Sequence, residues 1–164
     1  MKRQTAFLFF ALSLLSILSF RPAPPHRDRH RAGAINKELL LKLVNEARRT
    51  GVQCGSVWHP PAPPVAWNSQ LEAAALDHSA DMFRHNYFSH IESDGSTANI
   101  RIERRGYVWM AYGENIGFGY TSEQEVVDGW LKSPGHCKNI MNPQYQEMGV
   151  ARAGDYWTQD FARK

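Results

Sequence analysis

Apolar residues recur at helical spacing in residues 36–49, which predicts a first amphipathic helix. Asn36 is suited to cap its N-terminus, and Gly51 ends it because glycine readily adopts the backbone conformation found at helix ends. The inward positions are Leu40, Leu43, Val44 and Ala47. A loop follows, in which four prolines between residues 60 and 64 exclude helix and central strand.

The second periodic stretch, residues 71–90, is the one around which the chain is organised. It predicts an amphipathic helix that ends in a short aromatic loop. Ser69 and Glu72 have the spacing of a capping box, which marks the helix start. The apolar face carries Leu71, Ala74, Ala75, His78 and Met82. His85 lies seven residues after His78 and is expected on nearly the same side.

A turn follows, and residues 97–105 then predict a short helix with Ile100 inward. Its arginines, of which Arg101 is the first, are most simply a solvated face. The pattern becomes strand-like at Ile116 and Phe118, after a glycine-rich segment that contains Glu114. Glycines at this density indicate that the backbone passes close to another element or to a ligand.

The C-terminal part predicts two more helices and a hairpin. Ser122 and Glu125 have capping-box spacing at the start of a helix over residues 122–131. Ser133 is a natural cap for a short helix with Pro134 at its first position, which places His136 in the first turn. Residues 149–153 and 156–162 alternate as a β-hairpin around a Gly-Asp turn.

Length and charge limit the function classes. The chain has 164 residues and is 43% hydrophobic, which is enough for one domain with a proper core, assigned to residues 35–164. Residues 1–34 hold six basic residues and one acidic residue, a charge of +5, and the remainder holds 13 basic and 15 acidic residues, a charge of −2. A nucleic-acid-binding domain is basic where it is folded. We therefore expect no nucleic-acid partner.

The N-terminal segment is typical of an exported protein. Residues 1–20 combine a short basic region with an uncharged apolar run, as in a signal peptide, and an uncleaved membrane anchor is the alternative. Residues 21–34 are basic and proline-rich and predict a disordered linker. We expect a periplasmic or extracellular protein, tethered to the membrane if the signal is not cleaved.

Cys54 and Cys137 fit an oxidising compartment, where two cysteines favour a disulfide over two buried thiols. Such a bridge closes a long loop and stabilises the fold by roughly 4 kcal/mol in the chain-entropy model.

Three side chains form the candidate site. His90, Glu114 and His136 all fall where helices and strands end, which is where binding and catalytic sites are usually built. Two imidazoles and a carboxylate can hold a divalent metal such as zinc, perform acid–base chemistry, or simply stabilise a polar cavity. His78 on an apolar helix face is more simply a core histidine. Ser133 lies three residues before His136, but no nucleophile elbow surrounds it.

Four motifs, HSADMFRHNYFSH, GENIGFG, WLKSPGHCKNIMN and YWTQDFA, occur in this order and resemble the CAP superfamily of cysteine-rich secretory, antigen-five and pathogenesis-related proteins, in its bacterial SCP-like form. The resemblance covers residues 36–164. It implies a three-layer α-β-α sandwich of the α+β class, export, and a cleft that holds histidine and glutamate residues. It also implies lipid, sterol or protein ligands, and no established catalytic activity.

The eukaryotic members of that family carry a His, Glu, Glu, His set, and the resemblance transfers half of it. The first histidine matches His90 and the first glutamate matches Glu114. The second glutamate falls at Ser133 and the last histidine at Tyr156, neither of which is the family residue. His136, from the SPGH motif of the bacterial form, is expected in the same cleft.

The sequence therefore predicts an exported binding or structural module, monomeric and associated with the cell envelope, whose cleft contains His90, Glu114 and His136 together with His78, Ser133 and Tyr156. Its partner is a small molecule, lipid or protein. The alternative is a metal-dependent or acid–base hydrolase that uses His90, Glu114 and His136. A third interpretation gives Glu114 and the histidines only a structural role.

Overall fold

The computed structural model describes residues 34–164, so the expected signal segment and nearly all of the linker lie outside the described residues. The helices are α1 (Lys37–Thr50), α2 (Ser69–His85), α3 (Ala98–Arg104), α4 (Glu123–Lys132) and α5 (Pro134–Met141). The strands are β1 (Val52–Cys54), β2 (Val57–His59), β3 (Ala66–Trp67), β4 (Ala111–Phe118), β5 (Glu147–Ala153) and β6 (Tyr156–Arg163). In this part of the chain, no helix has the length and apolar character needed to cross a bilayer.

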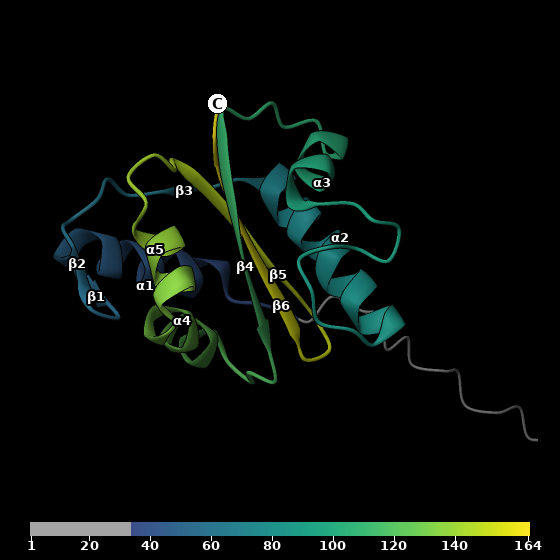
Figure 1. Ribbon diagram of the computed structural model, residues 1–164, viewed down its shortest axis with the longest axis horizontal. Helices are drawn as coiled ribbons and strands as arrows, with labels where there is room; N and C mark the ends of the chain where they lie inside the picture. The colour runs from purple at the N-terminus through teal and green to yellow at the C-terminus, as the bar shows by residue number, and fades with distance from the viewer. Residues whose placement is uncertain (1–33) are drawn as a thin grey trace, which may run out of the picture.

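A four-stranded sheet in the order β3-β5-β6-β4 forms the middle layer. Helices α2 and α3 cover one face, and α1, α4 and α5 cover the other (Figure 1). β5 and β6 pair antiparallel as the predicted hairpin, β4 pairs antiparallel with β6, and β3 is parallel to β5. The three-layer α-β-α sandwich expected from the sequence is confirmed.

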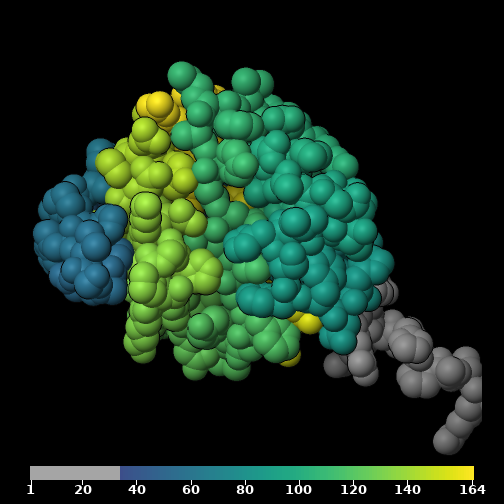
Figure 2. All heavy atoms as spheres, viewed as in Figure 1, coloured from purple at the N-terminus to yellow at the C-terminus, as the bar shows by residue number. Residues whose placement is uncertain are grey.

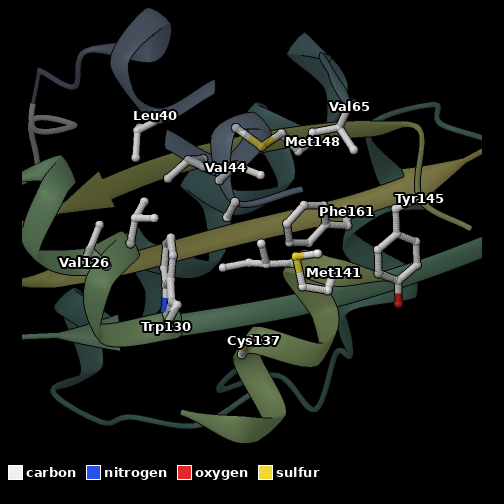
Figure 3. Close-up of a cluster of buried hydrophobic side chains, with 14 of the residues drawn as sticks. Leu40, Val44, Val65, Val126, Trp130, Cys137, Met141, Tyr145, Met148 and Phe161 are labelled. Atoms are coloured by element: carbon white, nitrogen blue, oxygen red, sulfur yellow. The ribbon is translucent and has the colours of Figure 1, made fainter. Parts of the chain in front are cut away.

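The larger core lies between the sheet and the layer of α1, α4 and α5. Trp130 of α4, Ile140 of α5 and Phe161 of β6 are almost fully buried there (Figure 3). Cys54 and Cys137 form the predicted disulfide, which ties β1 to α5 across this layer. Burial on both faces explains why nearly every residue of β6 is inaccessible to solvent.

Several local expectations were wrong. Asn68, not Ser69, caps α2, because its side chain accepts hydrogen bonds from the backbone amides of Gln70 and Leu71. Ser133 precedes α5 but its side chain makes no capping bond. Ile100, which was predicted to face inward, is 38% exposed. Ile102 is buried instead, so the buried face of α3 is not the predicted one.

The loop before the prolines also differs from its prediction. It contains a short β1–β2 hairpin next to the disulfide, which was not expected. The four prolines themselves lie outside any helix or strand, as predicted.

Strand β4 lies at the edge of the sheet, and side chains from the neighbouring layer cover its outer carbonyl groups. Tyr145 donates to the carbonyl of Tyr112 at 2.8 Å, and Asn139 donates to that of Glu114 at 3.0 Å. Trp130 donates through Nε1 to the carbonyl of Ile116 at 3.0 Å. Alternate acceptors along the edge are thus satisfied without a further strand.

Candidate functional site

The site centres on Glu114, which β4 holds with its side chain only 4% exposed. His90 lies in the segment after α2, and its Nδ1 is 2.7 Å from Oε1 of Glu114. Because a carboxylate only accepts hydrogen bonds, the hydrogen atom in this contact is on Nδ1 of His90. In the neutral ring, Nε2 then carries no hydrogen atom. The His90 side chain is 55% exposed, so a solvent-accessible imidazole is hydrogen-bonded to a buried carboxylate.

Arg101 completes this contact and contradicts the expectation of a solvated arginine face. Its side chain is 1% exposed, and Nη2 donates to Oε2 of Glu114. Nη1 donates to the carbonyl of Ser96 at 3.2 Å and to that of His90 at 3.4 Å. Arg101 therefore neutralises Glu114 and also holds the backbone of the segment that carries His90. Arg104 and Arg105 are exposed, as predicted.

His78 is a buried core histidine that supports the same segment. It is completely inaccessible, and its Nε2 lies 2.8 Å from the carbonyl oxygen of Ser89, the residue before His90. Burial lowers the pKa of His78 to about 4, so the ring is neutral under ordinary conditions. His85, expected on nearly the same side, is 54% exposed instead, with Nε2 3.3 Å from Asp81.

Glu114 and Asp160 are register partners on β4 and β6, and their pKa values move in opposite directions. Burial raises the pKa of Glu114, but the His90 hydrogen bond and the charge of Arg101 outweigh it, so the pKa falls below its ordinary value. Asp160 is fully buried, and its carboxyl oxygens have no hydrogen-bond partner in the described chain. Burial and the charge of Glu114 raise its pKa well above the ordinary value.

His136 lies at the start of α5, on the other side of β4. Its ring is partly buried, and its pKa is lowered by burial and further by the nearby charge of His90. The backbone carbonyl of His136 accepts a hydrogen bond from Asn115 at 3.2 Å. The two imidazoles therefore lie within electrostatic range of each other, but only His90 contacts Glu114 directly.

The other two expected residues do not contact Glu114. Ser133 lies between α4 and α5, and its hydroxyl makes no hydrogen bond to His136. Tyr156 is buried, and its hydroxyl lies 3.3 Å from Oδ1 of Asn86. Its ring packs against Phe118 with the ring centres 4.8 Å apart, which places it beside an aromatic strip rather than on the carboxylate.

The aromatic strip consists of Phe88 and Phe118 together with Ile91, and two of its members, Phe88 and Ile91, lie within two residues of His90 in the chain. Phe88, Ile91 and Phe118 are each more than half exposed, and the ring centres of Phe88 and Phe118 are 6.1 Å apart. In Figure 2 the teal segment after α2 and the yellow-green α5 stand on either side of the green β4. Large apolar side chains exposed together are typical of a surface that binds something.

The arrangement does not suit a zinc ion bound by His90, Glu114 and His136. One oxygen of Glu114 is engaged by His90, and the other is engaged by Arg101, whose positive charge lies where a cation would bind. Within residues 34–164, no group of three or more His, Cys, Asp or Glu side chains is disposed to hold a metal ion.

Sequence reasoning missed Arg101 and Asp160 as members of this cluster, and also Glu92, whose Oε1 lies 3.9 Å from Nε of Arg101. Arg101 sits in a short helix beside two exposed arginines, so its burial left no signal in the pattern. Asp160 offered one: it is an acidic residue inside a predicted strand of the hairpin, and an acidic residue that becomes buried in a strand needs a partner or a proton.

Comparison with known proteins identifies relatives of the chain and proteins of similar fold. Curated relatives include the uncharacterized membrane protein YlbC and the uncharacterized protein YkwD of Bacillus subtilis (strain 168), each 35% identical, over 61% and 62% of this chain. The chain spans only 29% and 40% of their lengths.

A crystal structure of an extracellular protein containing a SCP domain from Bacillus anthracis is 32% identical, with a TM-score of 0.68. The match covers 77% of this chain and 40% of that protein. The cysteine-rich secretory protein (CAP) family profile matches residues 41–161. Because this profile matches more than half of the chain, the chain belongs to the CAP family of cysteine-rich secretory proteins.

Proposed function

We propose that this chain is an exported binding module whose ligand contacts His90 and the exposed aromatic strip beside it. The observation that carries the proposal is the accessible His90 imidazole, oriented by a buried Glu114 that Arg101 holds in place. A side chain that contacts a ligand has to be held in one orientation by the residues around it. Export is supported by the disulfide, which persists in oxidising compartments, and by the extracellular relative.

The chemistry around His90 suggests the class of ligand. Phe88, Ile91 and Phe118 offer apolar contacts, and in the neutral imidazole Nε2 is an acceptor because Nδ1 carries the proton. An apolar molecule with one hydroxyl group fits both features, with the hydroxyl donating to Nε2. This class includes the lipid and sterol ligands that the family resemblance implies.

No contact in residues 34–164 favours the hydrolase alternative. The His90 ring is paired with a carboxylate, and no hydroxyl or thiol within the described chain is hydrogen-bonded to it. The proposal therefore assigns His90 a binding role and involves no metal.

The test uses 1-decanol as the probe, added to the full chain and followed by NMR chemical shifts. We expect saturable shifts at Phe88, His90 and Phe118, and a Kd about 5-fold weaker in His90→Ala because a hydrogen bond of about 1 kcal/mol is lost. His85→Ala is the matched control, since His85 is equally exposed but lies away from Glu114. Absence of saturable shifts at these residues would contradict the proposal. So would stoichiometric zinc binding that is lost in both His90→Ala and His136→Ala.

A further inference from the structure

Two buried side chains, His78 and Arg101, each lie within ion-pair distance of Glu92 without a hydrogen bond to it. Oε1 of Glu92 lies 3.9 Å from Nδ1 of His78 and 3.9 Å from Nε of Arg101. The three side chains are between 0% and 9% exposed. His78 Nδ1 and Arg101 Nε have no hydrogen-bond partner in the described chain. Buried polar atoms are rarely left in this state, so the gap between them requires an explanation.

The protonation states around this gap follow from the neighbouring contacts. His78 Nε2 lies 2.8 Å from the carbonyl oxygen of Ser89, and a carbonyl only accepts, so Nε2 carries the proton. The buried ring is neutral, and its Nδ1 is therefore an acceptor. Glu92 Oε1 is a second acceptor, and the Nε–H of Arg101 is a donor. Around Glu92 Oε1 there are thus one further acceptor and one donor, each 3.9 Å away.

We infer that one water molecule is bound between His78, Glu92 and Arg101 as a fixed part of the fold. It accepts a hydrogen bond from Arg101 Nε–H and donates to His78 Nδ1 and to Glu92 Oε1. Atoms 3.9 Å apart are too far for a direct hydrogen bond, but a water about 2.8 Å from each can join them. A water with three protein partners is typical of buried sites.

Charge selects water over an ion at this position. The guanidinium of Arg101 repels a cation, while the carboxylates of Glu92 and Glu114 repel an anion. A direct contact between Arg101 and Glu92 would remove the water but leave the acceptor of His78 unpaired. A small neutral molecule that both donates and accepts satisfies all three groups.

The site also has a route to solvent. Glu92 and Arg101 line a charged surface pocket of about 240 Å³. The rest of its lining is polar or charged, namely Asp77, Asp81, Arg84, Ser93, Asp94 and Arg104. Solvent can therefore reach Glu92 and Arg101 through this pocket.

The bound water supports the two residues that hold the His90 segment. His78 bonds the carbonyl before His90, and Arg101 bonds both the carbonyl of His90 and the carboxylate of Glu114. A positioning role for the water toward the ligand rests on the proposed function, whereas the existence of the water does not.

A crystal structure of the full chain at a resolution that defines ordered water tests the inference. We expect a density peak within about 3.2 Å of His78 Nδ1, Glu92 Oε1 and Arg101 Nε. A direct hydrogen bond between Glu92 and Arg101, with no peak between them, would overturn it. The test uses the free protein, so its outcome is independent of 1-decanol binding.

NMR of the histidine nitrogens gives a second measurement in solution. We expect His78 to be neutral and protonated on Nε2 at pH 7, with an NOE from water to its ring that persists in the His85→Ala control. In Glu92→Leu the ring should keep its tautomer and lose this NOE. A charged His78, or a proton on Nδ1, would refute the water site. If Glu92→Leu does not fold, the wild-type tautomer and the crystal structure decide.

Discussion

Two acidic residues of the site are chemically alike, but their pKa values move in opposite directions. Contacts with His90 and Arg101 lower the pKa of Glu114, whereas the pKa of Asp160, whose carboxyl oxygens have no hydrogen-bond partner in the described chain, is raised well above its ordinary value. The difference arises from the partners rather than from burial, since both side chains are buried. One guanidinium stabilises one carboxylate, and a second negative charge in the same space would be repelled.

Asp160→Asn should therefore change the pH dependence of stability. The pKa of Asp160 is raised in the fold, so its contribution is fully present below the unfolded value near 4 and is lost as pH rises toward the folded value. Asparagine has no proton to lose. The difference in Tm between variant and wild type should thus shift in favour of the variant between pH 4 and pH 7, by roughly 3 °C for each 1 kcal/mol. Calorimetry across this range measures it.

Asp155→Asn is the control for this prediction, because Asp155 is exposed in the β5–β6 turn. Its Tm should follow the wild-type profile. Parallel profiles for Asp160→Asn and wild type would show that Asp160 is ionised in the fold.

At the scale of elements, the position of α2 depends on a close approach to β5. A Cβ atom built on Gly149 would lie 2.0 Å from the backbone nitrogen of Glu72 and 2.5 Å from the carbonyl carbon of Leu71. The first turn of α2 thus rests directly on the strand backbone. This contact sets the height of α2 above the sheet, and with it the position of His78 and of the segment that carries His90.

Gly149→Ala should destabilise the fold by roughly 3 kcal/mol, because the added methyl group would overlap the backbone of α2 at Leu71 and Glu72. Urea unfolding of the full chain measures the loss. Gly135→Ala is the matched control, since no atom lies within 4 Å of its Cβ position and alanine favours a helix. Equal stability of the two variants would mean that α2 can move away from β5 at little cost.

The sequence predicted the positions of the helices and strands along the chain well, but it predicted poorly which side of a short helix is buried. Helical spacing located α1, α2 and α4, and alternation located the hairpin of β5 and β6. Ile100 and Arg101 were both assigned to the wrong side of α3, because seven residues are too few for an apolar pattern to define a face. That His90 and Glu114 share a cleft was expected from their positions at element ends and from the family motifs, but their direct contact was not. Arg101, Glu92 and Asp160 come together near Glu114 from different segments of the chain. A periodic pattern within one segment does not predict such contacts.

At the scale of the whole molecule, the disulfide connects two parts of the layer opposite α2. Cys54 ends β1 and Cys137 lies in α5, and the bridge spans 83 residues. Both cysteines are buried, so the bridge is shielded from solvent. The loop that it closes contains α2, α3 and β4, and therefore His90, Arg101 and Glu114.

Replacing both Cys54 and Cys137 with serine should lower the free energy of unfolding by about 4 kcal/mol, because the unfolded chain regains the freedom that an 83-residue loop removes. Denaturant titration of both proteins measures the difference, with reduced wild type as a second reference. A loss below about 1 kcal/mol would show that the unfolded chain is already compact between these positions.

The covered edge of β4 has a consequence for how copies of this protein meet at high concentration. A β-strand from a second molecule can extend the sheet only after the phenol of Tyr145, the amide of Asn139 and the indole of Trp130 have left the carbonyls that they occupy. The strand that carries the site's carboxylate is thereby kept from becoming the template on which a fibril grows.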